Sequence, residues 1–385
     1  MGGGMARRYV ELCRRFGNGG DAKMEVSTVS APDAGEFDAG ESYSIHRQPF
    51  GFDRANRFTN QLRWGAWLGR YGRGRVHVIH CGNIRPVGYA VTFSQLQLGV
   101  PYLLYVNGGD LLRERSKASA RRTKRAGARR IMGSAAGIVA TSSWVAELAG
   151  EVMQAVGIEN MPPVGAFDLG TDPVAFHPSR DTGSLRSRWG VGSAPVMLTV
   201  ARLVPHKGQD SAIRALAALR DEFPDLRYVI VGEGPDKERL RALAGELGVA
   251  DRIVFAGLLP DNELAEAYAT ATIYVGLSRI DREINVEGFG ISYLEAAASG
   301  IPSVAGDSGG VRSAVRDGDT GIVVPPLDFS TIAAAIASLL RDDELRSGMG
   351  RAGRDAVETH YNWDRVARDT REFTYAVIGD ARRRQ

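Results

Sequence analysis

The chain has little cysteine and no long apolar run. Cys13 and Cys81 are its two cysteines. This excludes a disulfide framework and a cysteine-rich metal site, and it is typical of a reducing compartment such as the cytoplasm. No apolar stretch reaches the roughly 18 residues of a membrane-spanning helix, and no secretory signal is recognisable. No Asp-x-Asp motif follows an expected strand, so we predict neither a metal ion nor another cofactor.

The charges divide unevenly along the chain, although the net charge is only +3. Residues 1–180 contain 23 Lys and Arg against 15 Asp and Glu, whereas residues 181–385 contain 25 against 30. Opposite balances in the two halves indicate a different partner for each half. A chain of 385 residues is also longer than the roughly 250–300 residues that one core usually serves. We therefore expect two domains.

The most basic stretch is residues 113–130, which run from Arg113 to Arg130 and hold nine basic residues and one acidic residue. A nucleic-acid site would interleave aromatic residues or show a known module, and neither is present. A basic helix can instead lie against anionic lipid head groups, at about 1 kcal/mol per charge. A solvated helix without a partner is the alternative, and the sequence does not separate the two.

Expected strands and helices alternate in the first half, which predicts a parallel sheet with helices on both faces. The strands are expected at residues 24–30, 43–48, 76–80, 101–106 and 137–141. Asn107 and Asp110 follow one of these strands, at the edge where such sheets bind ligands. Asn107 is therefore a candidate to hold a substrate hydroxyl, although an Asn-Gly pair is also common in plain turns.

Three glycines, Gly2, Gly3 and Gly4, open an amphipathic helix over residues 5–16. In an α/β domain such a glycine run normally follows a strand, and we expect that first strand to be missing from this chain. Because Gly3 and Gly4 have no Cβ atoms, their backbone can approach a bound phosphate or sugar closely. A tag-like tail is the alternative.

Strands and helices alternate again in the second half, with strands expected at residues 195–201, 227–231, 252–256, 272–277, 302–305 and 320–324. This alternation predicts a second doubly wound α/β domain. No Gly-x-Gly-x-x-Gly signature follows these strands, so a nicotinamide cofactor is not expected. Arg202 and Lys207 lie in the loop after the first strand. They suit a diphosphate, because Arg offers a bidentate contact and Lys a point charge.

Residues 287–295 carry two carboxylates, Glu287 and Glu295, on either side of a glycine-rich turn. We expect a helix over residues 291–299, whose geometry would leave the N–H groups of residues 288–291 without a partner inside the helix, at the positive end of its dipole. Such donors bind phosphate or hydroxyl groups, and carboxylates accept hydrogen bonds from sugar hydroxyls. Taken alone, the motif also fits an ordinary turn with two solvated acids.

Together, these segments resemble the GT4 family of retaining glycosyltransferases, which have the GT-B fold. The resemblance rests on Ala201-Arg202-Leu203, Lys207-Gly208, residues 232–235, residues 287–295 and Gly309-Gly310. Residues 202–210 and 304–310 are most similar to phosphatidylinositol mannosyltransferases. The resemblance implies an α/β architecture of two doubly wound, Rossmann-like domains that face each other across a cleft. Residues 1–175 would bind the acceptor, residues 176–360 would bind the nucleotide sugar, and residues 361–385 would pack back on the first domain as a helix.

The resemblance also implies a role for each matching residue. Arg202 and Lys207 would neutralise the donor diphosphate, Glu287 would hold the donor sugar, and Glu295 would hold the ribose. The implied donor-binding residues are Gly3, Gly4, Gly232, Arg252, Ile253, Gly288, Phe289, Gly290, Ile291 and Glu295. On the acceptor side the implied residues are Asn107 and Asp110, although relatives often carry a histidine where this chain has Asn107.

The implied reaction is metal-independent transfer of a hexose, with retention, from a UDP- or GDP-linked sugar to a lipid or saccharide acceptor. The implied location is the cytoplasm, at the inner face of the membrane if residues 113–130 bind anionic lipid. No nucleic-acid partner is expected. Two alternatives stay open: a truncated, membrane-associated relative that binds nucleotide sugar without catalysis, and a nucleotide-sugar epimerase, which the spacing of Glu287 and Glu295 disfavours.

Overall fold

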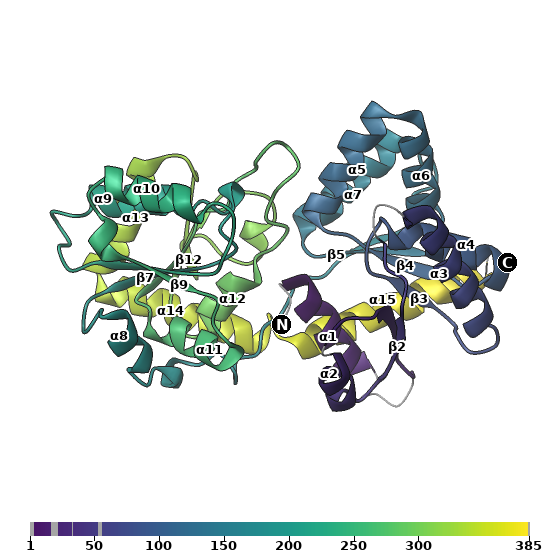
Figure 1. Ribbon diagram of the computed structural model, residues 1–385, viewed down its shortest axis with the longest axis horizontal. Helices are drawn as coiled ribbons and strands as arrows, with labels where there is room; N and C mark the ends of the chain where they lie inside the picture. Colours follow the sequence, from purple (N-terminus) through teal and green to yellow (C-terminus); the bar gives the residue numbers. More distant parts are fainter. Residues whose placement is uncertain (1–3, 17–21, 33, 53–55, 384–385) are drawn as a thin grey trace. The chain divides into compact units, whose positions relative to one another are not determined.

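The chain divides into two compact units in a computed structural model that describes residues 4–16, 22–32, 34–52 and 56–383 (Figure 1). Unit 1 comprises Met1–Phe167 and Trp363–Gln385, and unit 2 comprises Asp168–Asn362. Within these described ranges, no helix is both long enough and apolar enough to cross a membrane. The predicted α/β architecture, with parallel sheets in two units, is confirmed.

Unit 1 contains two separate parallel sheets, one of strands β1 and β2 and one in the order β3-β4-β5-β6. Its elements are α1 (Gly4–Phe16), β1 (Glu25–Val29), α2 (Ala34–Gly40), β2 (Ser44–Gln48), α3 (Arg57–Tyr71), β3 (Ile79–Cys81), α4 (Val87–Leu98), β4 (Tyr102–Tyr105), α5 (Gly108–Ala120), α6 (Arg122–Gly133), β5 (Gly137–Ala140), α7 (Ser143–Val156), β6 (Val164–Ala166) and α15 (Trp363–Arg383). Helix α1 begins at the first described residue, Gly4.

The local sequence explains the central elements of unit 1. All residues of β4 and β5 are buried, as expected for parallel strands covered on both faces. Helix α7 begins after Ser142, whose Oγ accepts a hydrogen bond from the backbone N–H of Val145 at 3.2 Å. A serine cap of this kind is worth about 1 kcal/mol. The helix then buries Val145, Leu148 and Val152 on one face.

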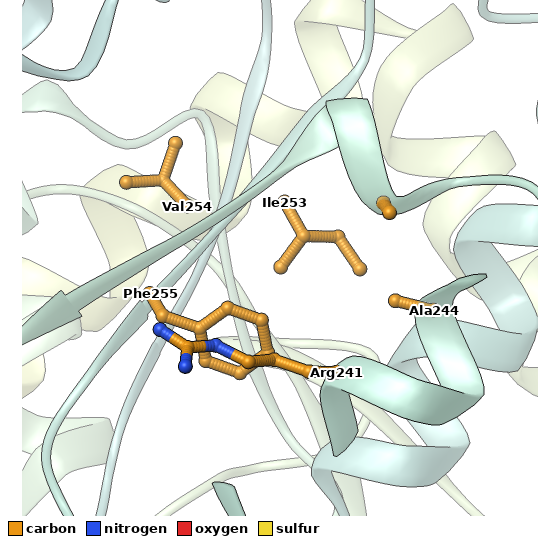
Figure 2. A pocket seen from close by; sticks show the side chains of 6 residues that line it. Arg241, Ala244, Ile253, Val254 and Phe255 are labelled. Carbon is orange, nitrogen blue, oxygen red and sulfur yellow. The ribbon is translucent and has the colours of Figure 1, made fainter. Parts of the chain in front are cut away.

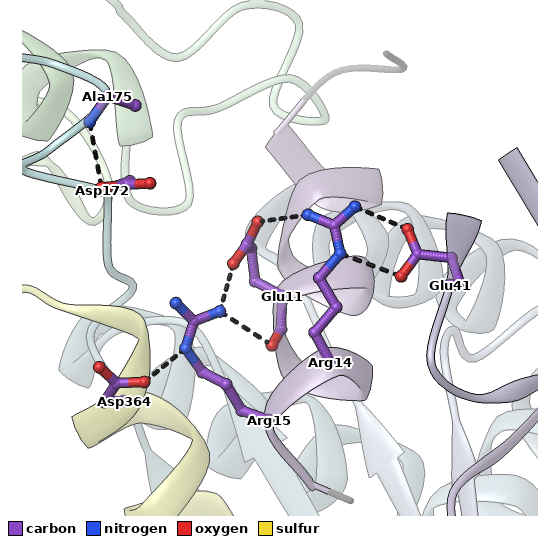
Figure 3. Close-up of polar contacts among 7 residues, drawn as sticks. All are labelled: Glu11, Arg14, Arg15, Glu41, Asp172, Ala175 and Asp364. Carbon is purple, nitrogen blue, oxygen red and sulfur yellow. Dashed lines mark hydrogen bonds and ion pairs between the residues drawn. The ribbon is translucent and has the colours of Figure 1, made fainter. Parts of the chain in front are cut away.

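The last helix of the chain, α15, joins α1 in unit 1 through an ion pair. The Nε atom of Arg15 lies 2.6 Å from Oδ1 of Asp364. Figure 3 marks this pair with a dashed line. The neighbouring Arg14 binds the carboxylate of Glu41 with two nitrogens, at 3.0 and 2.6 Å. These contacts tie α1 both to the first turn of α15 and to the loop before β2.

Unit 2 is built around one six-stranded parallel sheet in the order β12-β11-β10-β7-β8-β9. Its elements are α8 (Ser184–Trp189), β7 (Val196–Val200), α9 (Gln209–Ala218), β8 (Arg227–Val231), α10 (Lys237–Glu246), β9 (Ile253–Gly257), α11 (Asp261–Thr270), β10 (Ile273–Gly276), α12 (Ile291–Ala298), β11 (Ser303–Gly306), β12 (Gly321–Val324), α13 (Phe329–Arg341) and α14 (Asp343–Thr359).

The helices of unit 2 cover both faces of this sheet. Helices α9, α10 and α13 lie on one face and α11, α12 and α14 on the other (Figure 1). Apolar side chains such as Leu216, Leu240 and Ile336 are buried between the first group and the strands, and each contributes about 1.5–3 kcal/mol by leaving water. A Gly-x-Gly-x-x-Gly spacing does occur at residues 348–353, but it lies inside α14 and not after a strand.

The order of strands reverses at the centre of this sheet. The chain runs from β7 through β8 to the edge strand β9, and then returns to β10 on the other side of β7. Ligands of doubly wound sheets bind where the carboxyl ends of strands meet such a reversal. The loops that follow β7 and β10 are therefore where the fold itself places a binding site.

Candidate functional site

Lys207 and Glu287 meet at this reversal. Lys207 ends a short 3-10 turn, Pro205–Lys207, after β7, and Glu287 lies in the loop between β10 and α12. The ammonium of Lys207 donates to Oε2 of Glu287, and their side chains are 20% and 17% exposed. The predicted cation and the predicted acid thus form an ion pair at the carboxyl edge of the sheet.

His206 shows that other charged groups lie close to this pair. Burial is the main reason that its pKa lies below the ordinary value. The charges of Lys207 and Arg202 lower that pKa further, whereas Glu287 and Asp281 raise it. The Arg202 side chain is exposed. The pKa of His206 therefore responds to four charges, of which Arg202 belongs to an exposed residue.

The turn that contains Lys207 packs directly against the end of β10. Gly208 has φ of 73°, and a Cβ atom there would lie 1.9 Å from the carbonyl oxygen of Leu277. The backbone N–H of Arg279 also donates to the carbonyl of His206 at 2.9 Å. Only a residue without a side chain allows this approach, so Gly208 determines how close Lys207 lies to the β10 loop.

The backbone of Glu287 is held from the opposite side by the loop after β11. The N–H of Gly310 donates to the Glu287 carbonyl at 2.9 Å. At Gly309 φ is 60°, and a Cβ atom would lie 2.3 Å from the same oxygen. The glycine pair singled out in the sequence therefore fixes the position of Glu287.

The amino end of α12 opens at the same edge. Its N-cap residue is Gly290, with φ of 99° and no side chain that caps the helix. The N–H groups of the first turn of α12 follow Gly288 and Phe289 in the sequence. They are suited to bind a phosphate or hydroxyl oxygen, because they lie at the positive end of the helix dipole. This agrees with the predicted placement of the turn, although α12 ends at Ala298, one residue earlier than expected.

Glu295 lies in the second turn of α12 and faces α11. It is 6% exposed, and Oε2 accepts a hydrogen bond from the Tyr268 hydroxyl at 2.7 Å. Its predicted contact with a ribose stays a prediction.

Of the remaining predicted residues in unit 2, Gly232 lies at the site edge, and Arg252 and Ile253 do not. Gly232 follows β8, and its N–H donates to the Gly257 carbonyl at 2.8 Å. Arg252 and Ile253 stand at the amino end of β9, which is the opposite edge of a parallel sheet. The guanidinium of Arg252 donates to the carbonyls of Arg220 and Phe223, at 3.1 and 3.4 Å. Their predicted contact with the donor base stays a prediction, and both residues lie at this opposite edge.

The sequence also contains a second candidate for the segment beside a donor base. The carboxyl end of β9 is Gly257, followed by Leu258, which is 77% exposed. Residues that line a ligand in such a sheet usually follow a strand. The stretch after Gly257 is therefore a further candidate.

A cavity of about 420 Å³ lies between β9 and α10, around Ile253. Its lining residues are Arg241, Ala244, Ala250, Ile253, Val254 and Phe255, several of which Figure 2 shows. The guanidinium carbon of Arg241 lies 5.4 Å from the centre of the Phe255 ring. This lining offers one cation and no acid or nucleophile, so it does not compete with the Lys207 and Glu287 edge as a reactive site.

In unit 1, Asn107 and Asp110 lie at the carboxyl end of β4 and the amino end of α5. The Nδ2 atom of Asn107 is 3.3 Å from Oδ2 of Asp110, and Nη2 of Arg113 is 2.7 Å from Oδ1. Arg113, which the sequence had placed only in the basic segment, therefore belongs to this group. Gly4 is the first residue of α1, and Gly3 lies outside the described residues.

The basic segment forms two helices, α5 and α6, instead of one. Arg122, Arg125 and Arg129 are exposed and follow a spacing of three and four residues, which puts them on one face of α6. Among the residues with described positions, no group of three or more His, Cys, Asp or Glu side chains could hold a metal ion.

Two family models match the chain. The glycosyl transferase 4-like domain matches residues 3–160, and glycosyl transferases group 1 match residues 185–356. The first match falls within unit 1 and the second within unit 2, so the two together account for most of the chain.

Curated relatives match over part of their length. The GDP-mannose-dependent alpha-(1-6)-phosphatidylinositol monomannoside mannosyltransferase of Mycolicibacterium smegmatis is 42% identical over 208 residues, which is 54% of this chain and 53% of the relative. The enzyme of the same name from Mycobacterium tuberculosis is 38% identical over 57% of this chain and 56% of its own. A D-inositol 3-phosphate glycosyltransferase of Acidothermus cellulolyticus is 36% identical, over 66% and 56%. The chain spans about half the length of the curated relatives it matches.

Solved structures match almost the whole chain. Anabaena HepE in complex with UDP and glucose has a TM-score of 0.77 and 17% identity, over 97% of this chain and 96% of that one. Sucrose-phosphate synthase from Thermosynechococcus elongatus also has a TM-score of 0.77, with 21% identity over 97% and 93%. At such identities the likeness shows the fold alone, and that fold is GT-B.

Proposed function

Because this chain belongs to the GT4 glycosyltransferases of GT-B fold, we propose that it transfers a hexose from a nucleoside diphosphate sugar to an acceptor hydroxyl. The observation that carries the proposal is the Lys207–Glu287 pair at the strand reversal, beside the uncapped amino end of α12. The cation suits a diphosphate, and the carboxylate suits the hydroxyls of a sugar.

The proposed donor is GDP-mannose. It is supported by the names of relatives that are GDP-mannose-dependent mannosyltransferases. A UDP-linked hexose is the alternative donor, in keeping with the nucleotide held by a protein of the same fold. In either case the base would lie near the carboxyl end of β9, at Gly257 and Leu258.

In the proposed mechanism Lys207 exchanges its partner when the donor binds. Its ammonium leaves Glu287 for the diphosphate, where it offsets the charge that grows as the bond to the sugar breaks, together with Arg202 and the first-turn N–H groups of α12. Glu287, released from the ion pair, accepts hydrogen bonds from the sugar. The acceptor hydroxyl then attacks the anomeric carbon from the face that the diphosphate leaves and gives its proton to the departing diphosphate, so the configuration is retained. No metal ion takes part in this scheme.

The stabilisation of the protein by different nucleoside diphosphates shows which donor it binds. With GDP at 100 times its dissociation constant, we expect stabilisation by about 2.7 kcal/mol, a rise in melting temperature of roughly 5–10 °C. UDP and ADP should give smaller shifts at equal concentration, and EDTA should change neither the GDP shift nor the rate of transfer. A protein that no nucleoside diphosphate stabilises would contradict the proposal, and strict dependence on Mg²⁺ would contradict the mechanism.

The proposed acceptor is a lipid-linked inositol or sugar, presented at an anionic membrane surface. It is supported by relatives named for phosphatidylinositol substrates and by the exposed arginines of α6. At about 1 kcal/mol per charge near such a surface, the arginine face of α6 gives weak, salt-sensitive attachment. The proposed location is accordingly the inner face of the cytoplasmic membrane.

We expect the protein to sediment with vesicles that contain anionic lipid, and to be released as salt rises. Replacing Arg122 and Arg129 with glutamine should weaken this attachment roughly 10-fold or more, because two charges are removed from the face. The matched control replaces two exposed arginines of unit 2, Arg214 and Arg351. Attachment that ignores salt, or that both double variants lose equally, would exclude the α6 surface.

A nucleotide-binding relative without transfer is the second candidate. The division of the unit 1 strands into two separate sheets favours it, because a sheet of two strands contributes little stability by itself. The assay that decides is release of GDP from GDP-mannose in the presence of a lipid acceptor. Release with formation of a glycosylated product supports the enzyme, and binding without release supports the second candidate.

A further inference from the structure

Arg279 contacts the Lys207 turn from the neighbouring loop in two ways. Its backbone N–H donates to the carbonyl of His206, the residue before Lys207, at 2.9 Å. Its guanidinium binds the Asp210 carboxylate with both terminal nitrogens, at 2.8 and 2.9 Å. Asp210 stands in the first turn of α9, three residues after Lys207. A single residue of the β10 loop thus holds the chain on both sides of Lys207.

The ion pair between Arg279 and Asp210 is strong enough to hold the Lys207 turn in place. The side chains of Arg279 and Asp210 are only 16% and 18% exposed, so water and salt screen it less than a surface pair. Bidentate bonds between a guanidinium and a carboxylate are roughly twice as strong as neutral hydrogen bonds, and they also fix orientation. Lysine cannot reproduce this planar, two-pronged contact.

We infer that Arg279 is a positioning residue for Lys207: it fixes the turn so that the ammonium meets the distal phosphate of a nucleoside diphosphate. The inference rests on the proposed function. Arg279 itself is occupied by Asp210, and it acts through the turn. Without it the charge of Lys207 remains, but its place is no longer fixed, and a displacement near 1 Å can cost about 10²-fold in rate.

A second arginine provides a control within the same cluster. Arg239 binds Asp236 with two nitrogens, both at 2.6 Å, and its Nη2 lies 3.7 Å from Asp210. Its side chain is 49% exposed, and none of its recorded bonds reaches the backbone of residues 204–208. Removing Arg239 therefore takes away a similar charge near Asp210 and leaves the contact between the two loops intact.

The test compares Arg279→Gln, Arg279→Lys and Arg239→Gln with the full-length protein. Hydrogen exchange is measured in residues 203–212, and affinities for GDP and GMP are measured by calorimetry. In Arg279→Gln we expect faster exchange in this segment and a 10- to 100-fold loss of GDP affinity, with GMP affinity changed less than about threefold, because GMP lacks the distal phosphate. Arg279→Lys should fall between, and Arg239→Gln should resemble the unaltered protein.

Each other outcome overturns the inference. Unchanged exchange in residues 203–212 of Arg279→Gln excludes a positioning role, whatever reaction the protein performs. An equal loss of GDP and GMP affinity indicates a general structural role. If the unaltered protein binds no nucleoside diphosphate, the proposed function fails and the inference, which rests on it, fails too; faster exchange would then show only that Arg279 holds the turn. If Arg279→Gln does not fold, Arg279→Lys carries the same comparison.

Discussion

Replacing Lys207 with alanine is expected to lower the rate of sugar transfer by about 10²–10³, the usual cost of losing one preorganised group that stabilises developing charge. Lys207 is paired with Glu287, and the chain on both sides of it is held by Arg279 of the β10 loop. The loss should appear mainly in kcat, because the charge on the diphosphate grows as the sugar leaves. Initial rates of GDP release at saturating donor measure it.

Lys23→Ala is the matched control. Lys23 also pairs with a glutamate, Glu25, at 2.9 Å, but it lies in unit 1 and its side chain is 79% exposed. It should transfer sugar at the unaltered rate. The melting temperature of Lys207→Ala should change little, because its ion pair lies at the edge of the sheet and not in the core. Near-normal transfer by a folded Lys207→Ala protein would remove the central residue of the proposal.

Replacing Gly208 with alanine is expected to destabilise unit 2 by about 2–5 kcal/mol. The estimate adds about 1–2 kcal/mol for a Cβ atom in the left-handed region to about 1–3 kcal/mol for overpacking. The new Cβ atom would lie 1.9 Å from the Leu277 carbonyl, which is backbone and cannot rotate away. The turn must shift, so transfer should also fall sharply. Thermal unfolding should show a drop of roughly 5–15 °C.

Gly248→Ala separates the cost of the left-handed backbone conformation from the cost of overpacking. Gly248 has φ of 67°, close to the 73° of Gly208, but a Cβ atom there meets nothing within 4 Å. It should therefore lose only the part that comes from backbone conformation, about 1–2 kcal/mol, and should keep its transfer activity. If Gly208→Ala and Gly248→Ala lower the free energy of unfolding equally, the close approach of Gly208 to the end of β10 does not contribute to the destabilisation.

Much of unit 2 follows from local sequence. The apolar runs around Met197, Val229 and Val275 are short and continuous, which is typical of buried parallel strands. The strands observed there, Val196–Val200, Arg227–Val231 and Ile273–Gly276, lie within the ranges expected. In unit 1 the weaker run over residues 76–80 gives a strand only from Ile79.

Two features of the site could not be placed from local sequence, for a physical reason. Arg252 and Ile253 were placed at the site because they adjoin a strand, but a parallel sheet has two unlike edges and they stand at its amino end. The contact of Arg279 with Asp210 was not foreseen, because it joins side chains 69 positions apart. Which edge of the sheet a residue occupies depends on the direction of the strand. Which side chain it contacts depends on residues far away in the sequence. Neither is visible in a local sequence pattern.

By itself the sequence determined which segments are strands and helices, where the glycines fall, and which charged residues follow a strand. These are local properties, set by apolar periodicity and by turn chemistry. Only the tertiary structure decided that Lys207 and Glu287, which are 80 positions apart, form a pair. That depends on β10 lying next to β7, and strand order is chosen by how the helices pack on both faces of the completed sheet, which is a property of the whole unit.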